Sequence, residues 1–143
     1  HLRIGVVVAF AGGAVAKLRR PVLAGVAGPV GSGRQGMSWI ALDDLLGIIQ
    51  RAVVDERYAG PINAVSPSPV DNRGFMKAMG RVLRRPTVAP LPAFVVRALF
   101  GKMGEEALLA GCRARPARLE ELGFRYDFPE LEDALRFELG RVH

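Results

Sequence analysis

The 143-residue sequence predicts an α/β fold, in which the last part of a parallel sheet is followed by a mostly helical region. Three observations point to this architecture. The run Leu2–Val8 is almost wholly apolar and β-branched, which is typical of a strand buried on both faces of a parallel sheet. Two shorter apolar runs, Met37–Leu42 and Pro61–Ser66, are separated by a segment of helical periodicity. From Pro92 onward the helical patterns predominate.

The first half of the chain also carries helix signals. Gly13–Leu18 predicts a short helix, which Pro21 and the glycines after it would end. Asp43 and Asp44 are expected to cap a second helix, because carboxylates at this end accept hydrogen bonds from free N–H groups. Asp71 is expected to cap a third helix. The apolar face of the second helix comprises Leu45, Leu46, Ile48, Ile49, Ala52 and Val53.

The last third of the chain predicts three more helices. An apolar helix is expected to stop at Gly101, and Pro116 and Gly123 stand where a first-turn proline and a helix-ending glycine belong. Phe124–Phe128 alternates apolar and polar residues as a short strand does. The final helix is expected to open at Pro129 and to turn Leu131, Leu135 and Leu139 inward.

Composition excludes several classes of site. The two histidines are His1 and His143, so no interior histidine can serve a Ser-His-Asp triad, a Cys-His pair or a zinc site, and we expect no metal. A single cysteine, Cys112, excludes an internal disulfide and predicts a reducing, cytoplasmic location. No apolar run reaches the ~18 residues that span a membrane.

The glycine-rich loop Gly28–Gly36 matches the glycine spacing of two phosphate-binding patterns but lacks other features that each requires. Gly31–Gly36 reads G-x-G-x-x-G, but a strand follows it, where a dinucleotide site needs a helix. Gly28–Gly33 has the spacing of a P-loop, yet Arg34 and Gln35 stand in place of the lysine and the hydroxyl residue. The glycines are therefore best explained by a tight bend in the chain.

Several pieces in a fixed order carry a resemblance to a known family. In the first half they are Leu2–Val7, Gly31–Asp44 and Gly60–Pro67; in the tail they are Leu91–Phe94, Gly101–Met103, Arg115–Leu119 and Leu122–Tyr126. Together they resemble the C-terminal half of an extended short-chain dehydrogenase/reductase, in the NAD(P)-dependent epimerase/dehydratase-like branch, including that branch's own C-terminal domain. The similarity covers essentially the whole chain.

The resemblance implies two regions. Residues 1–69 would form the terminal part of a Rossmann-like NAD(P)-binding domain, including the glycine-rich substrate loop, and residues 70–143 a mostly helical substrate lobe. The family transfers hydride with a glycine fingerprint and a Tyr-x-x-x-Lys pair, and neither is present: Tyr58 is followed four places on by Ile62, and Tyr126 by Glu130. We therefore assign no catalytic residue and expect the chain alone to be inactive and to bind no cofactor tightly.

The resemblance also implies which residues would face ligands in the complete parent protein, which would use NAD or NADP and a small polar or nucleotide-linked substrate. The expected cofactor contacts are Arg3, Val7 and Val8. The expected substrate contacts are Lys17, Arg34, Gln35, Ser38 and Trp39. Two positions depart from the family, since Gly36 replaces a common aromatic residue and Ala41 a common histidine.

Each of these residues also has a simpler structural explanation, and other functions stay open. Trp39 fits a core position and Arg34 a solvated or carbonyl-capping one. A ligand-free interaction module and a basic nucleic-acid-binding domain are the alternatives, the second because the net charge is +6. With 7% aromatic residues and scattered arginines, nucleic acid is not an expected partner. Self-association through Leu2–Val8 is expected if that strand is exposed, and no membrane partner is expected.

Overall fold

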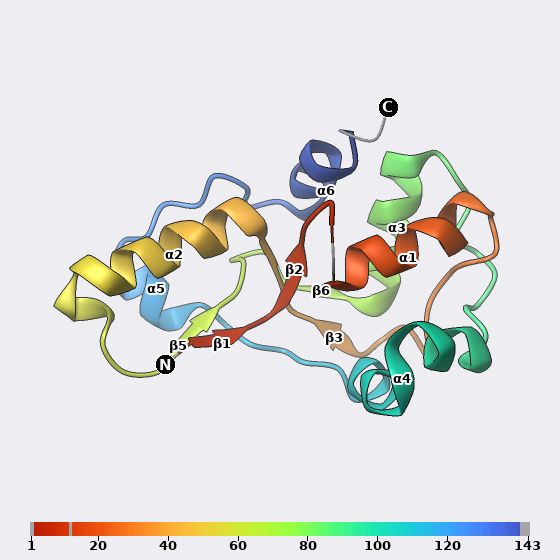
Figure 1. Ribbon diagram of the computed structural model, residues 1–143, viewed down its shortest axis with the longest axis horizontal. Helices are drawn as coiled ribbons and strands as arrows, with labels where there is room; N and C mark the ends of the chain where they lie inside the picture. Colours follow the sequence, from red (N-terminus) through yellow and green to blue (C-terminus); the bar gives the residue numbers. More distant parts are fainter. Residues whose placement is uncertain (1, 12, 141–143) are drawn as a thin grey trace.

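The computed structural model describes residues 2–11 and 13–140, and within them short strands alternate with helices. The strands are β1 (Leu2–Ile4), β2 (Val6–Val8), β3 (Gly36–Met37), β4 (Trp39–Ala41), β5 (Ile62–Ala64) and β6 (Val70–Asp71). The helices are α1 (Gly13–Leu23), α2 (Leu42–Val54), the short 3-10 helix η1 (Glu56–Tyr58), α3 (Asn72–Leu83), α4 (Ala93–Ala110), α5 (Ala117–Glu121) and α6 (Leu131–Leu139). In Figure 1, α2, α5 and β5 lie at one end of the molecule, and α1, α3 and α4 at the other.

The N-terminal apolar run changes its strand partner in the middle. β1 pairs in parallel with β5, and β2 pairs in parallel with β4. The change takes place at Gly5, whose N–H donates to the carbonyl of Ala64 (3.3 Å), while the N–H of the next residue, Val6, donates to the carbonyl of Ser38 (2.8 Å). A Cβ on Gly5 would lie 2.8 Å from that Ser38 oxygen, so the close approach requires glycine.

The expectation of one continuous strand buried on both faces is therefore wrong. Leu2–Val8 is two strands, and Ile4 is 51% exposed. The reason is that, among the described residues, β1 has one strand neighbour, β5, and its other edge is open. Neighbouring strands cover the edges of a strand, and its faces are buried only where other elements pack on the sheet.

Two hydrophobic cores lie on opposite sides of β4. Because side chains alternate along a strand, Trp39 enters the larger core and the adjacent Ile40 the smaller one. The larger core is covered by α1, α3 and α6, and the smaller one by α2 and α5. Val8 and Phe75, from either side of position 69, both belong to the larger core, and the division of the chain at 69 stays a prediction.

Several helix signals are confirmed. Asp71 caps α3, because its carboxylate accepts a hydrogen bond from the N–H of Gly74 at 2.7 Å. Leu131, Leu135 and Leu139 are all buried on α6. One stop signal acts differently, because α1 continues through Pro21 to Leu23. Gly101 has non-helical angles (φ 74°, ψ 176°), so α4 consists of two helical segments that meet at a kink there, as the expected stop requires.

The expected cap of α2 by two aspartates is wrong. The helix begins at Leu42 after Ala41, with no side-chain cap. Asp43 is exposed, whereas Asp44 is 2% exposed and accepts hydrogen bonds from the N–H groups of Asp127 (2.7 Å) and Phe128 (3.0 Å). Burial raises the pKa of Asp44 and the two amide bonds offset part of that rise. Asp44 thus anchors the segment that leads into α6.

The segment Phe124–Phe128, predicted as a strand, is irregular in the structure. Its residues are held by side chains rather than by a sheet ladder. The hydroxyl of Tyr126 donates to the carbonyl of Val65 at 2.7 Å, and its ring meets that of Phe124 edge to face at 5.0 Å. Because Asp44 occupies the neighbouring N–H groups, no strand can pair with them.

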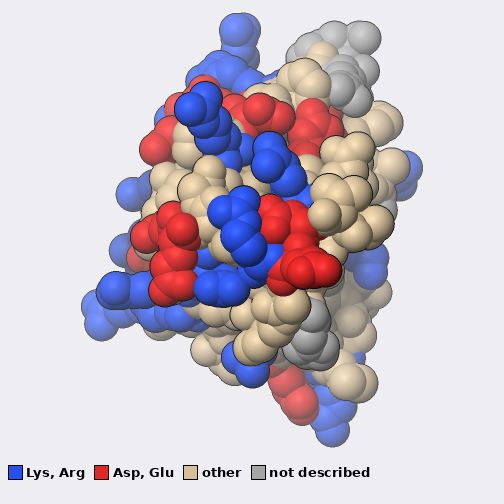
Figure 2. All heavy atoms as spheres, turned by 90° about the vertical axis from the view of Figure 1, so that its left-hand side faces the viewer, with Lys and Arg blue, Asp and Glu red and all other residues tan. Residues whose placement is uncertain are grey.

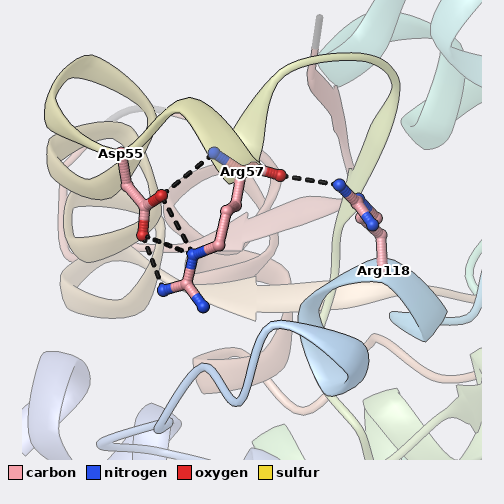
Figure 3. Close-up of polar contacts among 3 residues, drawn as sticks. All are labelled: Asp55, Arg57 and Arg118. Carbon is pink, nitrogen blue, oxygen red and sulfur yellow. Dashed lines mark hydrogen bonds and ion pairs between the residues drawn. The ribbon is translucent and has the colours of Figure 1, made fainter.

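Two arginines, Arg57 within the turn and Arg118 on α5, stabilise the turn after α2. The carboxylate of Asp55 accepts hydrogen bonds from the backbone N–H (3.0 Å) and the guanidinium (2.8–3.2 Å) of Arg57, which lowers the pKa of Asp55 (Figure 3). Arg118 on α5 donates to the carbonyl of Arg57 at 2.7 Å. Figure 2 shows acidic and basic side chains interspersed over the face of the molecule at this end.

Replacing Asp44 is expected to destabilise the fold. Asp44→Ala leaves two backbone N–H groups without their acceptor and should lower the free energy of unfolding by about 1–3 kcal/mol. Asp43→Ala, one residue earlier and exposed, should cost less than about 1 kcal/mol. Urea denaturation followed by circular dichroism measures both, and equal losses would contradict the anchoring role of Asp44.

Tyr126 is expected to make the fold sensitive to alkali. Burial raises its pKa above the ordinary value of 10.0, so the folded chain keeps the phenol protonated where the unfolded chain releases the proton. This stability is fully present below pH ~10 and is lost as the pH rises above it. Tyr126→Phe should flatten the fall in melting temperature between pH 9 and 11. An unchanged slope in the variant would show that another group causes the loss.

Candidate functional site

Two adjoining cavities open where β1 gives way to β2. The first, about 270 Å³ in volume, is the apolar hollow; it is lined by Ile4–Val6, Gly36–Ser38, Asn72, Ala107, Leu108, Gly111 and Cys112. The second, about 280 Å³ in volume, is the charged hollow; it is lined by Arg3–Gly5, Asn63, Val65 and Cys112–Ala114. The two share Ile4, Gly5 and Cys112 in their linings, so they lie next to each other.

The position of the hollows follows from the strand pairing. β1 leaves its partner β5 at Gly5, and crevices that bind ligands in open α/β sheets lie where the carboxyl ends of neighbouring strands diverge. The gap is lined by large apolar side chains on one side and by the end of α4 on the other. This is the geometry of a pre-formed small-molecule site.

The chain after α4 closes the hollows from the side. The N–H of Cys112 donates to the carbonyl of Gly36 (2.9 Å), and the carbonyl of Cys112 accepts hydrogen bonds from the N–H (3.2 Å) and hydroxyl (3.0 Å) of Ser38. The hydroxyl of Ser38 also accepts a hydrogen bond from the N–H of Ala114 at 2.8 Å. The segment Gly111–Ala114 is therefore held along β3 and β4 much like an added strand.

The structure separates the three residues expected to contact the cofactor. Arg3 is exposed and lines the charged hollow. Val7 is half-buried and packs against the smaller core, and Val8 has no exposed surface and belongs to the larger core. Neither valine lines a hollow, because the strand has left β5 and carries both residues into the interior.

Three of the expected substrate residues hold the loop together. Ser38 lines the apolar hollow but its hydroxyl is engaged as described. Trp39 is 1% exposed, and its indole N–H donates to the carbonyl of Ser68 at 2.9 Å. The amide of Gln35 donates to the carbonyls of Val30 (2.8 Å) and Leu108 (3.1 Å), which ties the glycine-rich loop to α4.

The other two expected substrate residues lie outside both hollows. Arg34 is exposed, and its carbonyl accepts a hydrogen bond from the guanidinium of Arg113, which itself lines the charged hollow. Lys17 is an exposed residue of α1 whose amine lies 5.5 Å from the centre of the Phe100 ring. Of the five residues, the structure thus brings Ser38 to the hollows, with Gln35 directly behind it.

Comparison with known proteins gives the family. Residues 91–138 match a family model described as a domain of unknown function, DUF1731. Epimerase family protein Mb2239 of Mycobacterium bovis is 41% identical over 139 residues, which are 97% of this chain and 46% of that protein. The crystal structure of human epimerase family protein SDR39U1 with NADPH superposes with a TM-score of 0.88 at 38% identity, over 97% of this chain and 47% of that one.

The chain corresponds to the C-terminal part of the epimerase family. The chain is also similar to the crystal structure of the nucleoside-diphosphate sugar epimerase from Corynebacterium glutamicum, with 31% identity and a TM-score of 0.71 over 98% of this chain and 26% of that one. The chain spans about half the length of the curated relatives it matches. The predicted resemblance and the Rossmann-like α/β fold class are thereby confirmed.

The residues that line the hollows of this epimerase-family chain were mostly missed by sequence reasoning. They include Ile4, Met37, Leu108, Cys112 and Arg113. One signal was available, because a glycine inside an apolar strand, such as Gly5, marks a point where another part of the backbone approaches closely. Nothing local in the sequence shows that Cys112 returns to β3, since that contact joins residues far apart in the chain.

The described residues contain no candidate metal centre and no membrane-spanning helix. Among residues 2–11 and 13–140, no group of histidine, cysteine, aspartate or glutamate side chains could hold a metal ion, and both histidines lie outside these ranges. No helix within the same ranges is long and apolar enough to cross a membrane.

Gln35 is expected to contribute to stability through the carbonyls it binds. Gln35→Ala removes both hydrogen bonds and should lower the free energy of unfolding by about 1–2 kcal/mol. Arg34→Ala, at the exposed neighbouring position, should change it by no more than about 0.5 kcal/mol. Urea titration of the two variants measures the difference. If Gln35→Ala leaves the free energy of unfolding unchanged, the side chain is not needed for stability and is available for the substrate role that the sequence predicts.

Proposed function

We propose that the chain forms the substrate-side wall of an NAD(P)-dependent epimerase- or reductase-like protein that acts on a small polar or nucleotide-linked substrate. The observation that carries the proposal is the pair of adjoining hollows at the point where β1 leaves β5. Ligand crevices of α/β sheets lie at such points. The similarity to human SDR39U1, whose crystal structure contains NADPH, supports a nicotinamide cofactor.

The charged hollow is suited to an anionic group of the cofactor or substrate. Arg3 and Arg113 both line it and both are exposed, so their guanidinium groups can reach a phosphate from the same side. Asn63 also lines this hollow, and its amide donates to the carbonyl of Arg115 at 3.2 Å. We therefore propose Arg3 and Arg113 as the anion-binding residues of this wall.

The groups that move hydride and protons are proposed to lie in the part of the relatives that this chain does not cover. A tyrosine with a lysine four residues later is not found in the chain, as Tyr58 and Tyr126 show. The chain alone is accordingly proposed to be inactive and to hold NAD or NADP weakly. The exposed single thiol of Cys112 supports a reducing location, which we propose to be the cytoplasm.

The first experiment that tests the proposed function is to sequence the coding DNA upstream of the codon for His1. An in-frame glycine fingerprint and Tyr-x-x-x-Lys pair would provide the remaining wall. A stop codon close upstream would contradict the proposal. The interaction module would then be preferred, because β1 has one strand neighbour among the described residues and Ile4 is 51% exposed.

Arg3 is expected to contribute to cofactor binding in the protein that includes this upstream segment. A charge-assisted hydrogen bond to phosphate is worth about 1.5–3 kcal/mol, so Arg3→Ala should raise the dissociation constant of NADPH at least about tenfold. Arg51→Ala, at an exposed arginine of α2 outside both hollows, is the control. NADPH fluorescence measures both. Equal affinities for the two variants would exclude Arg3 from the cofactor site.

A further inference from the structure

The polar side chains that line the apolar hollow already make hydrogen bonds to the protein itself. They are Ser38 and Asn72. Ser38 donates to the carbonyl of Cys112 and accepts from the N–H of Ala114. Asn72 is 1% exposed; its oxygen accepts a hydrogen bond from the N–H of Val30 at 2.7 Å, and its amide contacts the sulfur of Met37 at 3.6 Å. Both residues are occupied in holding the site together.

The backbone around the apolar hollow is similarly engaged. Its N–H groups donate to carbonyl oxygens of the protein at 2.8–3.3 Å in four lining residues, which are Gly5, Val6, Gly111 and Cys112. Most of the surface that faces the space is apolar, and its side chains include Ile4, Met37 and Leu108. A hydroxyl placed against this wall would lose its bonds to water and gain none in return.

The apolar hollow also has the size of a hydrocarbon group. Its volume is about 270 Å³. A dry cavity of about 150 Å³ lined by aliphatic side chains is enough to bind benzene. The hollow can therefore receive a six-membered carbon ring or a short alkyl chain with room to spare.

We propose that the substrate of this site carries an apolar ring or short hydrocarbon group, which fills the apolar hollow while its polar or anionic part lies toward Arg113 in the charged hollow, with Arg3 left to the cofactor. The inference rests on the proposed function and narrows its substrate class. A sugar ring with several hydroxyls is a poor match to this wall, because each buried hydroxyl needs a partner. An amphiphilic substrate fits both hollows through the shared residues Ile4, Gly5 and Cys112.

Two probes of equal ring size test this proposal on the chain itself. Cyclohexanol and glucose each contain a six-membered ring, but the first carries one hydroxyl and the second five. In ¹⁵N NMR titrations, cyclohexanol is expected to shift the amides of Val6, Met37 and Cys112, and glucose to reach the same shifts only at a concentration at least about tenfold higher. Equal or stronger effects of glucose would overturn the proposal, and so would no effect of either probe.

A filled hollow provides the control. Ala107 is an exposed residue of α4 that lines the apolar hollow, so Ala107→Trp should abolish the cyclohexanol shifts while the fold is kept. Ala98→Trp, exposed on the same helix and outside both hollows, should leave them unchanged. Cyclohexanol shifts that survive in Ala107→Trp would place the probe elsewhere and overturn the assignment. This outcome is separate from NADPH binding, which depends on Arg3 in the neighbouring hollow.

Discussion

The close contact between the backbone of Gly5 and the carbonyl of Ser38 is the constraint on which the rest of the structure depends. Because no side chain intervenes, the N-terminal run can leave β5 and pair with β4 within a single residue. After that change of partner, the N–H of Val6 donates to the carbonyl of Ser38. The hydroxyl of Ser38 in turn donates to the carbonyl of Cys112. Both hollows have Gly5 in their lining, so they lie at the junction between β1 and β2.

Features set by neighbouring residues could be predicted from the sequence. Asp71 caps α3 through an N–H three residues away, and the spacing of Leu131, Leu135 and Leu139 decides which face of α6 is buried. Asp44 could not be assigned in this way. Its position allows a cap, but its actual partners, Asp127 and Phe128, lie 83 and 84 residues further along. The role of Asp44 therefore depends on which distant segment packs against it and not on local helix propensity.

The same limit applies to the candidate site. Polar residues in a glycine-rich loop fit a substrate-reading role, yet Gln35 and Ser38 are occupied by Leu108 and Cys112, which are remote in sequence. Arg3 lines the charged hollow because it is exposed on β1, and its contact with the cofactor stays a prediction. A polar side chain in a loop can be assigned to a ligand only when the nearby carbonyls and amides already have partners of their own.

The opposite orientation of Trp39 and Ile40 on β4 has a consequence for how the chain unfolds. A three-residue strand forms the boundary of both hydrophobic cores, so neither core can lose its packing without exposing β4 to the other. The two ends of the molecule in Figure 1 therefore have no separate opening equilibrium through this strand, and its amides should exchange with solvent hydrogen only in the global unfolding event. A ligand held against β3 and β4 would then protect both halves of the chain alike.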